Sequence, residues 1–146
     1  MRRFLTATTV VLSTIVLSAT TALAAAPHIV GNPSATVSGN SLIISASVAG
    51  LGNVSTVELS LEGTVEVSSR CYTRSGNRPQ AANKQETITV DETGTFPVRN
   101  GRTNATFTVT PLSTLTCPPG QIVVIEDVSY NLSLIYQGEV LATFSG

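Results

Sequence analysis

The residue types that usually carry catalysis are scarce in this chain, which has one histidine and two cysteines. A nucleophilic serine or cysteine needs a histidine base within hydrogen-bond reach, and a zinc site needs several ligands at a workable spacing. The single histidine, His28, is remote in sequence from both cysteines, and no glycine-rich phosphate loop or H-E-x-x-H pair occurs. We therefore expect no triad, no metal site and no cofactor.

Carboxylates remain as candidate catalytic groups, because acidic residues occur as the adjacent pairs Glu126-Asp127 and Asp91-Glu92. Neighbouring strand residues point to opposite faces, so an adjacent pair does not converge on one substrate. A glycoside hydrolase needs two carboxyl groups that face each other, about 5 to 9.5 Å apart. A small carboxylate-dependent glycoside hydrolase stays an alternative, although a turn at residues 91–94 and solvated surface charges are favoured.

The local anomaly in charge is a basic run. Arg70, Arg74, Arg78 and Lys84 fall within fifteen residues that contain no acid. Such a run can bind an anionic partner, such as a carboxylated glycan, a wall polymer or an acidic protein face, with Tyr72 as an apolar platform. A solvated loop without a partner is the other interpretation, because charged runs mostly form solvent-exposed surface.

The first 26 residues have the pattern of a cleavable secretory signal peptide. Arg2 and Arg3 precede an apolar stretch, and Ala-x-Ala cleavage sequences end at Ala24 and Ala26. Serine and threonine interrupt the stretch, which argues against a membrane anchor. We expect a secreted, extracellular protein without a membrane span after cleavage, whose residues 27–146 form one domain.

Charge and cysteine content define the mature part further. Without Arg2 and Arg3, six basic and nine acidic residues give a net charge of minus three, so affinity for nucleic acid is not indicated. Cys71 and Cys117 both lie in the part that would reach an oxidising compartment, and they are predicted to form one disulfide.

Apolar residues alternate with polar ones through most of the mature chain, which is the pattern of strands with one buried face. Helical periodicity is nearly absent. An all-β fold follows: an antiparallel β-sandwich, immunoglobulin-like in architecture, of seven to eight strands, with a small β-barrel as the alternative. The strand candidates are residues 42–48, 57–61, 65–67, 87–91, 105–109, 122–125, 128–136 and 140–144.

Two stretches lack the strand pattern, residues 73–84 and 111–120, and each adjoins a cysteine. A disulfide would therefore hold the bases of two loops together at one end of the sandwich. A rigid loop with a disulfide at its base also suits a secreted protease inhibitor that presents residues 73–84 as a substrate mimic.

Several loop and turn motifs resemble those of a group of small secreted proteins of actinobacteria. These motifs are Cys71 with Asn77, Pro79 and Asn83, then residues 94–101, then residues 117–120. The resemblance covers roughly residues 60 to 130. It implies an extracellular bacterial protein with one disulfide, and it implies no active site.

The function expected from the sequence is a secreted, non-enzymatic binding module or an envelope-associated structural module. Loops held by a rigid scaffold are where binding residues usually lie. We expect the end joined by the disulfide to bind, with Tyr72, Arg74, Arg78 and Lys84 as the contact residues.

Overall fold

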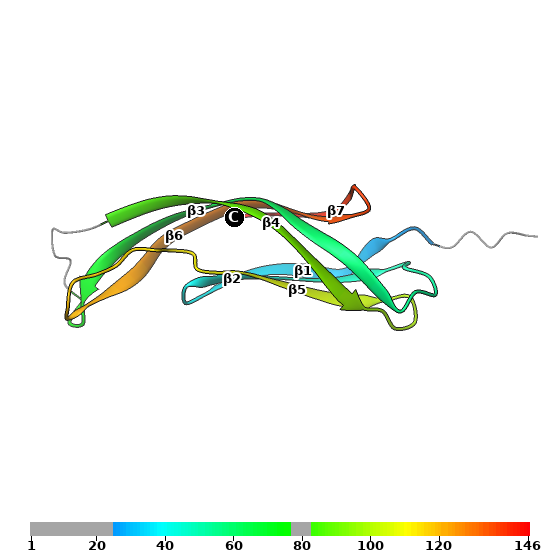
Figure 1. The fold of residues 1–146 in the computed structure, drawn as a ribbon, viewed down its shortest axis with the longest axis horizontal. Coiled ribbons are helices and arrows are strands. Elements are labelled where there is room, and N and C mark those ends of the chain that lie inside the picture. The colour runs from blue at the N-terminus through cyan, green and yellow to red at the C-terminus, as the bar shows by residue number, and fades with distance from the viewer. Residues whose placement is uncertain (1–24, 77–82) are drawn as a thin grey trace, which may run out of the picture.

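The fold is a sandwich of two antiparallel sheets (Figure 1), seen in a computed structural model that describes residues 25–76 and 83–146. One sheet has the strand order β1-β2-β5 and the other β4-β3-β6-β7. The described residues contain no helix, and therefore no helix long and apolar enough to span a membrane. The strands are β1 (His28–Ser38), β2 (Ser41–Ala49), β3 (Thr56–Thr73), β4 (Asn83–Pro97), β5 (Thr103–Val109), β6 (Gln121–Tyr136) and β7 (Glu139–Ser145).

The alternation read from the sequence is realised as one buried face on each sheet. On β3 the odd-numbered residues face the other sheet, and Leu59, Leu61 and Val65 are completely buried there. Leu42, Ile44 and Val48 of β2 meet them from the opposite layer. The two sheets do not close into a barrel, so the barrel alternative is wrong. The predicted sandwich of seven to eight strands is confirmed, with seven strands in the described residues.

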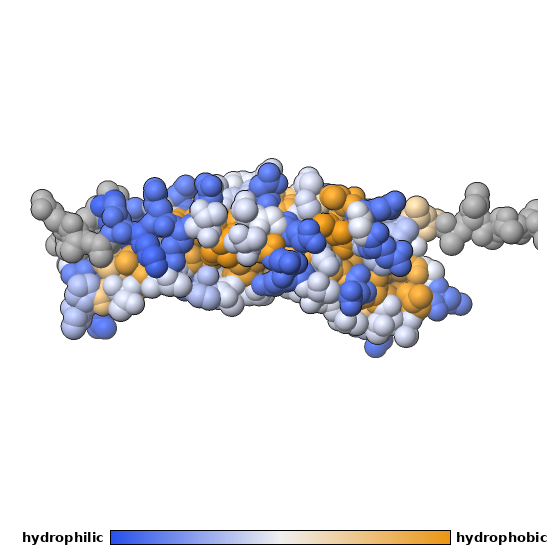
Figure 2. Space-filling view, turned by 45° about the horizontal axis from the view of Figure 1, so that its top comes forward, coloured by the Kyte–Doolittle hydropathy of each residue, from blue (hydrophilic) through white to orange (hydrophobic). Residues whose placement is uncertain are grey.

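The outer face of the four-stranded sheet is polar. Figure 2 shows hydrophilic residues spread over the top of the molecule, with hydrophobic residues visible between them. Glu58, Glu62 and Glu66 share this face because they occupy even positions of β3. Glu62 pairs directly with Asp91 of β4 on the exposed side of the sheet.

The strands are longer than the sequence pattern predicted. Residues 91–94, expected to form a turn, lie inside β4 and pair with residues 59–62 of β3, so that expectation is wrong. Aspartate, glutamate and glycine are poor strand formers, but β3 and β4 pair without a break from Thr56 to Arg70. A continuous ladder of this kind overrides the local preference.

The first strand escaped the sequence pattern because its alternation is interrupted. The pairing of β1 with β2 shifts register between Val30 and Ser34, where Pro33 has no N–H to donate to a ladder. His28 begins this strand and pairs with Ala49.

At one end the four-stranded sheet extends beyond the three-stranded sheet. Residues 110–120, which we call the strap, cross beneath the extension in Figure 1 and take the place of a missing strand. Leu112 of the strap is completely buried, and its N–H donates to Asn40 O in the β1–β2 turn at 2.9 Å. The strap thereby covers an inner face that the shorter sheet leaves open.

Replacement of Gly63 should destabilise the domain strongly. Gly63 lies within β3 at φ 142°, and a Cβ atom there would collide with the backbone carbonyl of Asn131 in β6. We expect Gly63→Ala to cost roughly 3 kcal/mol or more of unfolding free energy, measured by urea denaturation. Gly39→Ala is the control, since Gly39 has φ 57° but no neighbouring atom within 4 Å of the place that a methyl group would take. Equal losses in the two variants would contradict the proposed collision.

Candidate functional site

A disulfide joins the strap to β3, as the sequence predicted. Cys71 and Cys117 are 46 residues apart, with Cα atoms separated by 5.6 Å. Cys71 is completely buried on the inner face of β3. A disulfide of this kind indicates an oxidising environment.

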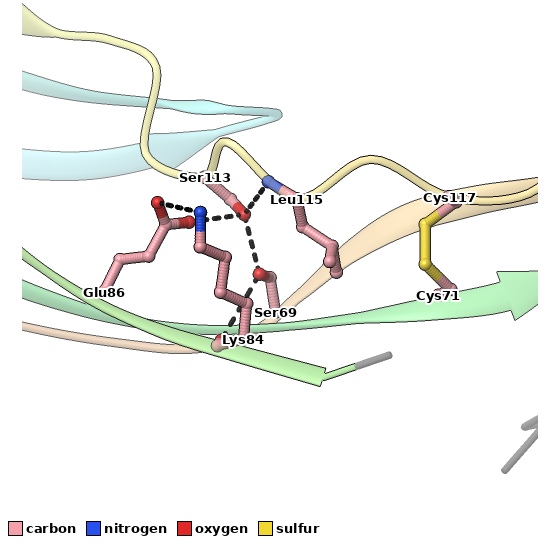
Figure 3. The surroundings of a disulfide bond; sticks show 7 residues. All are labelled: Ser69, Cys71, Lys84, Glu86, Ser113, Leu115 and Cys117. Atoms are coloured by element: carbon pink, nitrogen blue, oxygen red, sulfur yellow. Dashed lines mark hydrogen bonds and ion pairs between the residues drawn. A yellow bond between two sulfur atoms is a disulfide. The ribbon is translucent and has the colours of Figure 1, made fainter. Parts of the chain in front are cut away.

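Beside the disulfide, a cluster of hydrogen bonds ties the strap to β3 and β4 (Figure 3). Ser69 occupies an inner-facing position of β3, where it is completely buried, and its Oγ lies 2.6 Å from Ser113 Oγ. Ser113 Oγ donates to Glu86 Oε2 at 3.0 Å and accepts from Leu115 N at 3.2 Å. The buried hydroxyls therefore have partners, as buried polar groups require.

Glu86 of β4 is the acceptor at the centre of this cluster. Hydrogen bonds from the Thr114 side chain and backbone, aided by Lys84 and Ser113 and opposed by burial, lower the pKa of Glu86 from 4.5 to about 2. Lys84 Nζ lies 3.1 Å from Glu86 Oε1. A carboxylate held in this ionised state is suited to anchoring the strap, whereas a general acid at neutral pH needs a raised pKa.

A second charged cluster lies on the outer face of the same sheet. Arg70 Nε is 3.4 Å from Glu126 Oε2, and the Tyr72 hydroxyl donates to Glu126 Oε1 at 2.5 Å. The pairing of β3 with β6 shifts register between Ser68 and Ser69, and Glu126 is the extra residue at this bulge. The bulge brings an acid from a distant part of the sequence to the basic run.

The predicted binding residues do not form one surface. Tyr72 lies on the outer face, whereas Lys84 pairs with Ser69 in the sheet and its side chain turns toward the strap. Arg74 is exposed just beyond β3, and Arg78 lies outside the described residues. Because β3 continues to Thr73 and β4 begins at Asn83, the predicted loop 73–84 is shorter at both ends.

Neither Glu86 nor Glu126 was predicted from the sequence to be a partner of the basic run. Glu86 could have been found from the sequence, because Lys84 and Glu86 are two residues apart in a strand and therefore share a face. Glu126 offered no such signal, since its approach to Arg70 depends on how β6 pairs with β3.

An open groove of about 650 Å³ lies between β6, the strap and the β1–β2 turn. Its polar groups are largely engaged within the protein. Asn40 Nδ2 donates to Ser113 O at 3.1 Å, and Asn40 Oδ1 accepts from Ser113 N at 2.8 Å. The rest of the lining is mainly apolar, from Val37, Leu115, Val123, Ile125 and Val128, and it also includes Glu126 and Asp127.

Among the described residues no cluster suits a metal ion, and the directly paired carboxylates lie on an exposed sheet face. Within residues 25–76 and 83–146, no group of three or more His, Cys, Asp or Glu side chains could hold a metal ion. Glu62 and Asp91 are neighbours, but they lie on an exposed sheet face rather than across a cleft.

Comparison with known proteins adds no assignment to this site. The sequence matches no family model, and no curated protein matches it. Function must therefore be inferred from the geometry.

Loss of the disulfide should lower stability substantially. Chain entropy over a separation of 46 residues predicts a cost of about 4 kcal/mol for the double variant Cys71→Ser with Cys117→Ser. The thermal midpoint should fall by roughly 10 °C or more in a domain of this size. Calorimetry measures this shift, with Ser68→Ala as a control next to the same strand segment. An unchanged midpoint would show that the disulfide does not secure the strap.

The Glu86 cluster should make stability depend on acid pH. The folded-state pKa of about 2 lies below the ordinary value of 4.5, so the stabilisation is fully present above pH 4.5 and is lost as the pH falls toward 2. The stability gap between the parent protein and Glu86→Gln should narrow over this interval in urea titrations. Glu66→Gln, at an exposed position of β3, is the control. A gap that does not change with pH would contradict the assigned pKa.

Proposed function

We propose that this protein is an extracellular, non-enzymatic binding module whose contact surface is the end of the sandwich held by Cys71 and Cys117. The observation that carries the proposal is the apolar groove between β6, the strap and the β1–β2 turn. A concave, mainly apolar site with few polar groups is the usual form of a binding site. The disulfide and the Glu86 cluster order the strap before a ligand arrives, which reduces the entropy cost of binding.

Export is part of the proposal. The signal-peptide pattern lies almost entirely outside the described residues, and the disulfide agrees with an oxidising compartment. The resemblance to small secreted proteins of actinobacteria also supports an extracellular role, either free or attached to the cell envelope.

An anionic partner has less support than the basic run suggested. The charges of Arg70 and Lys84 are balanced by Glu126 and Glu86. Attraction of an anionic glycan, wall polymer or protein would therefore rest on Arg74 and Arg78. The apolar groove therefore supports the proposal better than the basic run does.

A secreted protease inhibitor is the second candidate, favoured by one observation. The disulfide lies near the base of the connection from β3 to β4, which is the place where a substrate-mimicking loop needs to be held. Inhibition of secreted serine proteases at micromolar protein would support this alternative.

A retention assay tests the binding module. Mature protein should be retained on one or more of intact cells, isolated walls or polysaccharides. Leu115→Asp, which places a charge in the groove, should weaken retention at least tenfold, because an unpaired charge is costly to bury. Arg74→Ser with Arg78→Ser should remove only a salt-dependent part, about threefold.

The matched control for the retention assay is Thr89→Asp, at an exposed position of β4. This variant should be retained like the parent protein. Absence of retention on every surface, or equal retention of Leu115→Asp, would overturn the proposed contact surface. If the protein cleaved a polysaccharide, the proposal of a binding module would be wrong and the protein would be an enzyme.

A further inference from the structure

Part of β6 has a free edge. Strand β7 pairs with β6 only from Asn131 to Tyr136, and beyond it Gly146 exchanges two backbone hydrogen bonds with Tyr130. Figure 1 shows the C-terminus near the middle of the molecule, whereas β6 extends to one end of the molecule. Among the described residues, none forms a ladder with the side of residues 121–129 that faces away from β3.

The direction of the backbone groups on this edge follows from the pairing. Tyr130 directs its N–H and C=O to Gly146, away from β3, and residues of an antiparallel ladder alternate between their two neighbours. Its partner Val65 and the other odd residues of β3 as far as Ser69 therefore bond β4, while Arg70 and Tyr72 bond β6. Their partners Val124 and Ile122 face β3. Val123 and Ile125 consequently direct their N–H and C=O to the open side.

The groove lies beside this edge. Val123 and Ile125 pair with Cys71 and Ser69, which face the inner side of the sheet, so their side chains lie on the groove side. Val123 is 38% exposed and Ile122 is 48% exposed. Proteins usually protect an edge with lysine, proline or a bulge. Residues 121–125 contain neither lysine nor proline, and the bulge comes only after them.

Charge distinguishes among possible occupants. Asp127 is exposed and pairs with Ser68 on the outer face. Asp127, Ser68 and Glu66 line a hollow that contains three carboxylates, the third from Glu86. A basic side chain would complement this charge. In an antiparallel pair of two copies centred on Val123, Pro119 of the second copy would lie opposite Asp127. Pro119 provides neither a cation nor an N–H donor.

We propose that residues 121–125 of β6 bind an extended segment of a partner protein by strand addition. Apolar side chains of that segment enter the groove, and a basic residue on its other face lies beside Asp127. Strand addition obtains affinity from main-chain hydrogen bonds and specificity from pockets for alternate side chains. The inference rests on the proposed binding function and names the class of partner.

A synthetic peptide tests the geometry. The probe is a capped nine-residue peptide in which valine alternates with threonine, with one threonine near the N-terminus replaced by lysine. In an antiparallel strand the valines face the groove and direct their N–H groups to β6, while the threonine N–H groups point away. N-methylation of the valines should weaken binding at least tenfold, and N-methylation of the threonines by no more than about twofold, in calorimetric titrations.

Two variants of the protein test the same contact. Val123→Pro removes the N–H at the open edge without removing a bond to β3, so it should abolish peptide binding. Val123→Ala keeps this N–H donor and should bind the peptide more tightly than Val123→Pro. Thermal unfolding establishes that both variants fold, and the N-methylated peptides test the parent protein independently of either. Replacing the peptide lysine by glutamate should weaken binding about threefold to fivefold, and Asp127→Lys should reverse this preference.

Amide hydrogen exchange locates the contact. Binding should slow exchange at Val123 and Ile125, with little change at Ile122 and Val124, which already bond β3. Equal effects of the two N-methylations would overturn strand addition. If the protein formed dimers with a protected Val123 amide in the absence of peptide, the edge of β6 would bind a second copy of this chain instead. If the peptide does not bind but the protein is still retained on cells or walls, strand addition is rejected and the binding function stands. Failure of both assays rejects the binding module itself.

Discussion

The difference in length between the two sheets governs the rest of this structure. Strands β3 and β6 run past the end of β1, β2 and β5, so the inner face of the longer sheet needs cover that no strand supplies. The strap provides this cover, with Leu112 buried against the core and Cys117 bonded to Cys71. A segment with irregular backbone can occupy such a position only if its polar groups find partners.

Those partners explain why the inner face of β3 carries a buried serine near its end. Leu61, Val65 and Val67 meet the other sheet, but Ser69 meets the hydroxyl of Ser113 in the strap. Glu86 accepts three hydrogen bonds from Ser113 and Thr114. A charge-assisted cluster is stronger than one between neutral groups and also fixes geometry. The strap is thereby held in one position on the sheet.

The same length difference leaves both features on which binding is proposed. The strap covers the β3 side of the extension, while β7 ends before it reaches the corresponding part of β6. A groove lined by apolar side chains and an edge with unpaired backbone groups therefore lie next to each other. Because Asn40 and Ser113 use their polar groups to hold the strap, recognition in the groove depends mainly on apolar burial and on the backbone of the edge.

The sequence by itself determined the all-β fold class and predicted the cystine, because strand alternation and cysteine content are local or compositional signals. The pairing of strands in space decided that the fold is a sandwich rather than a barrel. It predicted neither the full lengths of β3 and β4 nor the bulge at Glu126, which depend on pairing between distant segments. The basic run was visible, but only the tertiary structure decided that Arg70 meets Glu126 while Lys84 turns to the opposite face. Register assigns each side chain to a face, and register is a property of the assembled sheet.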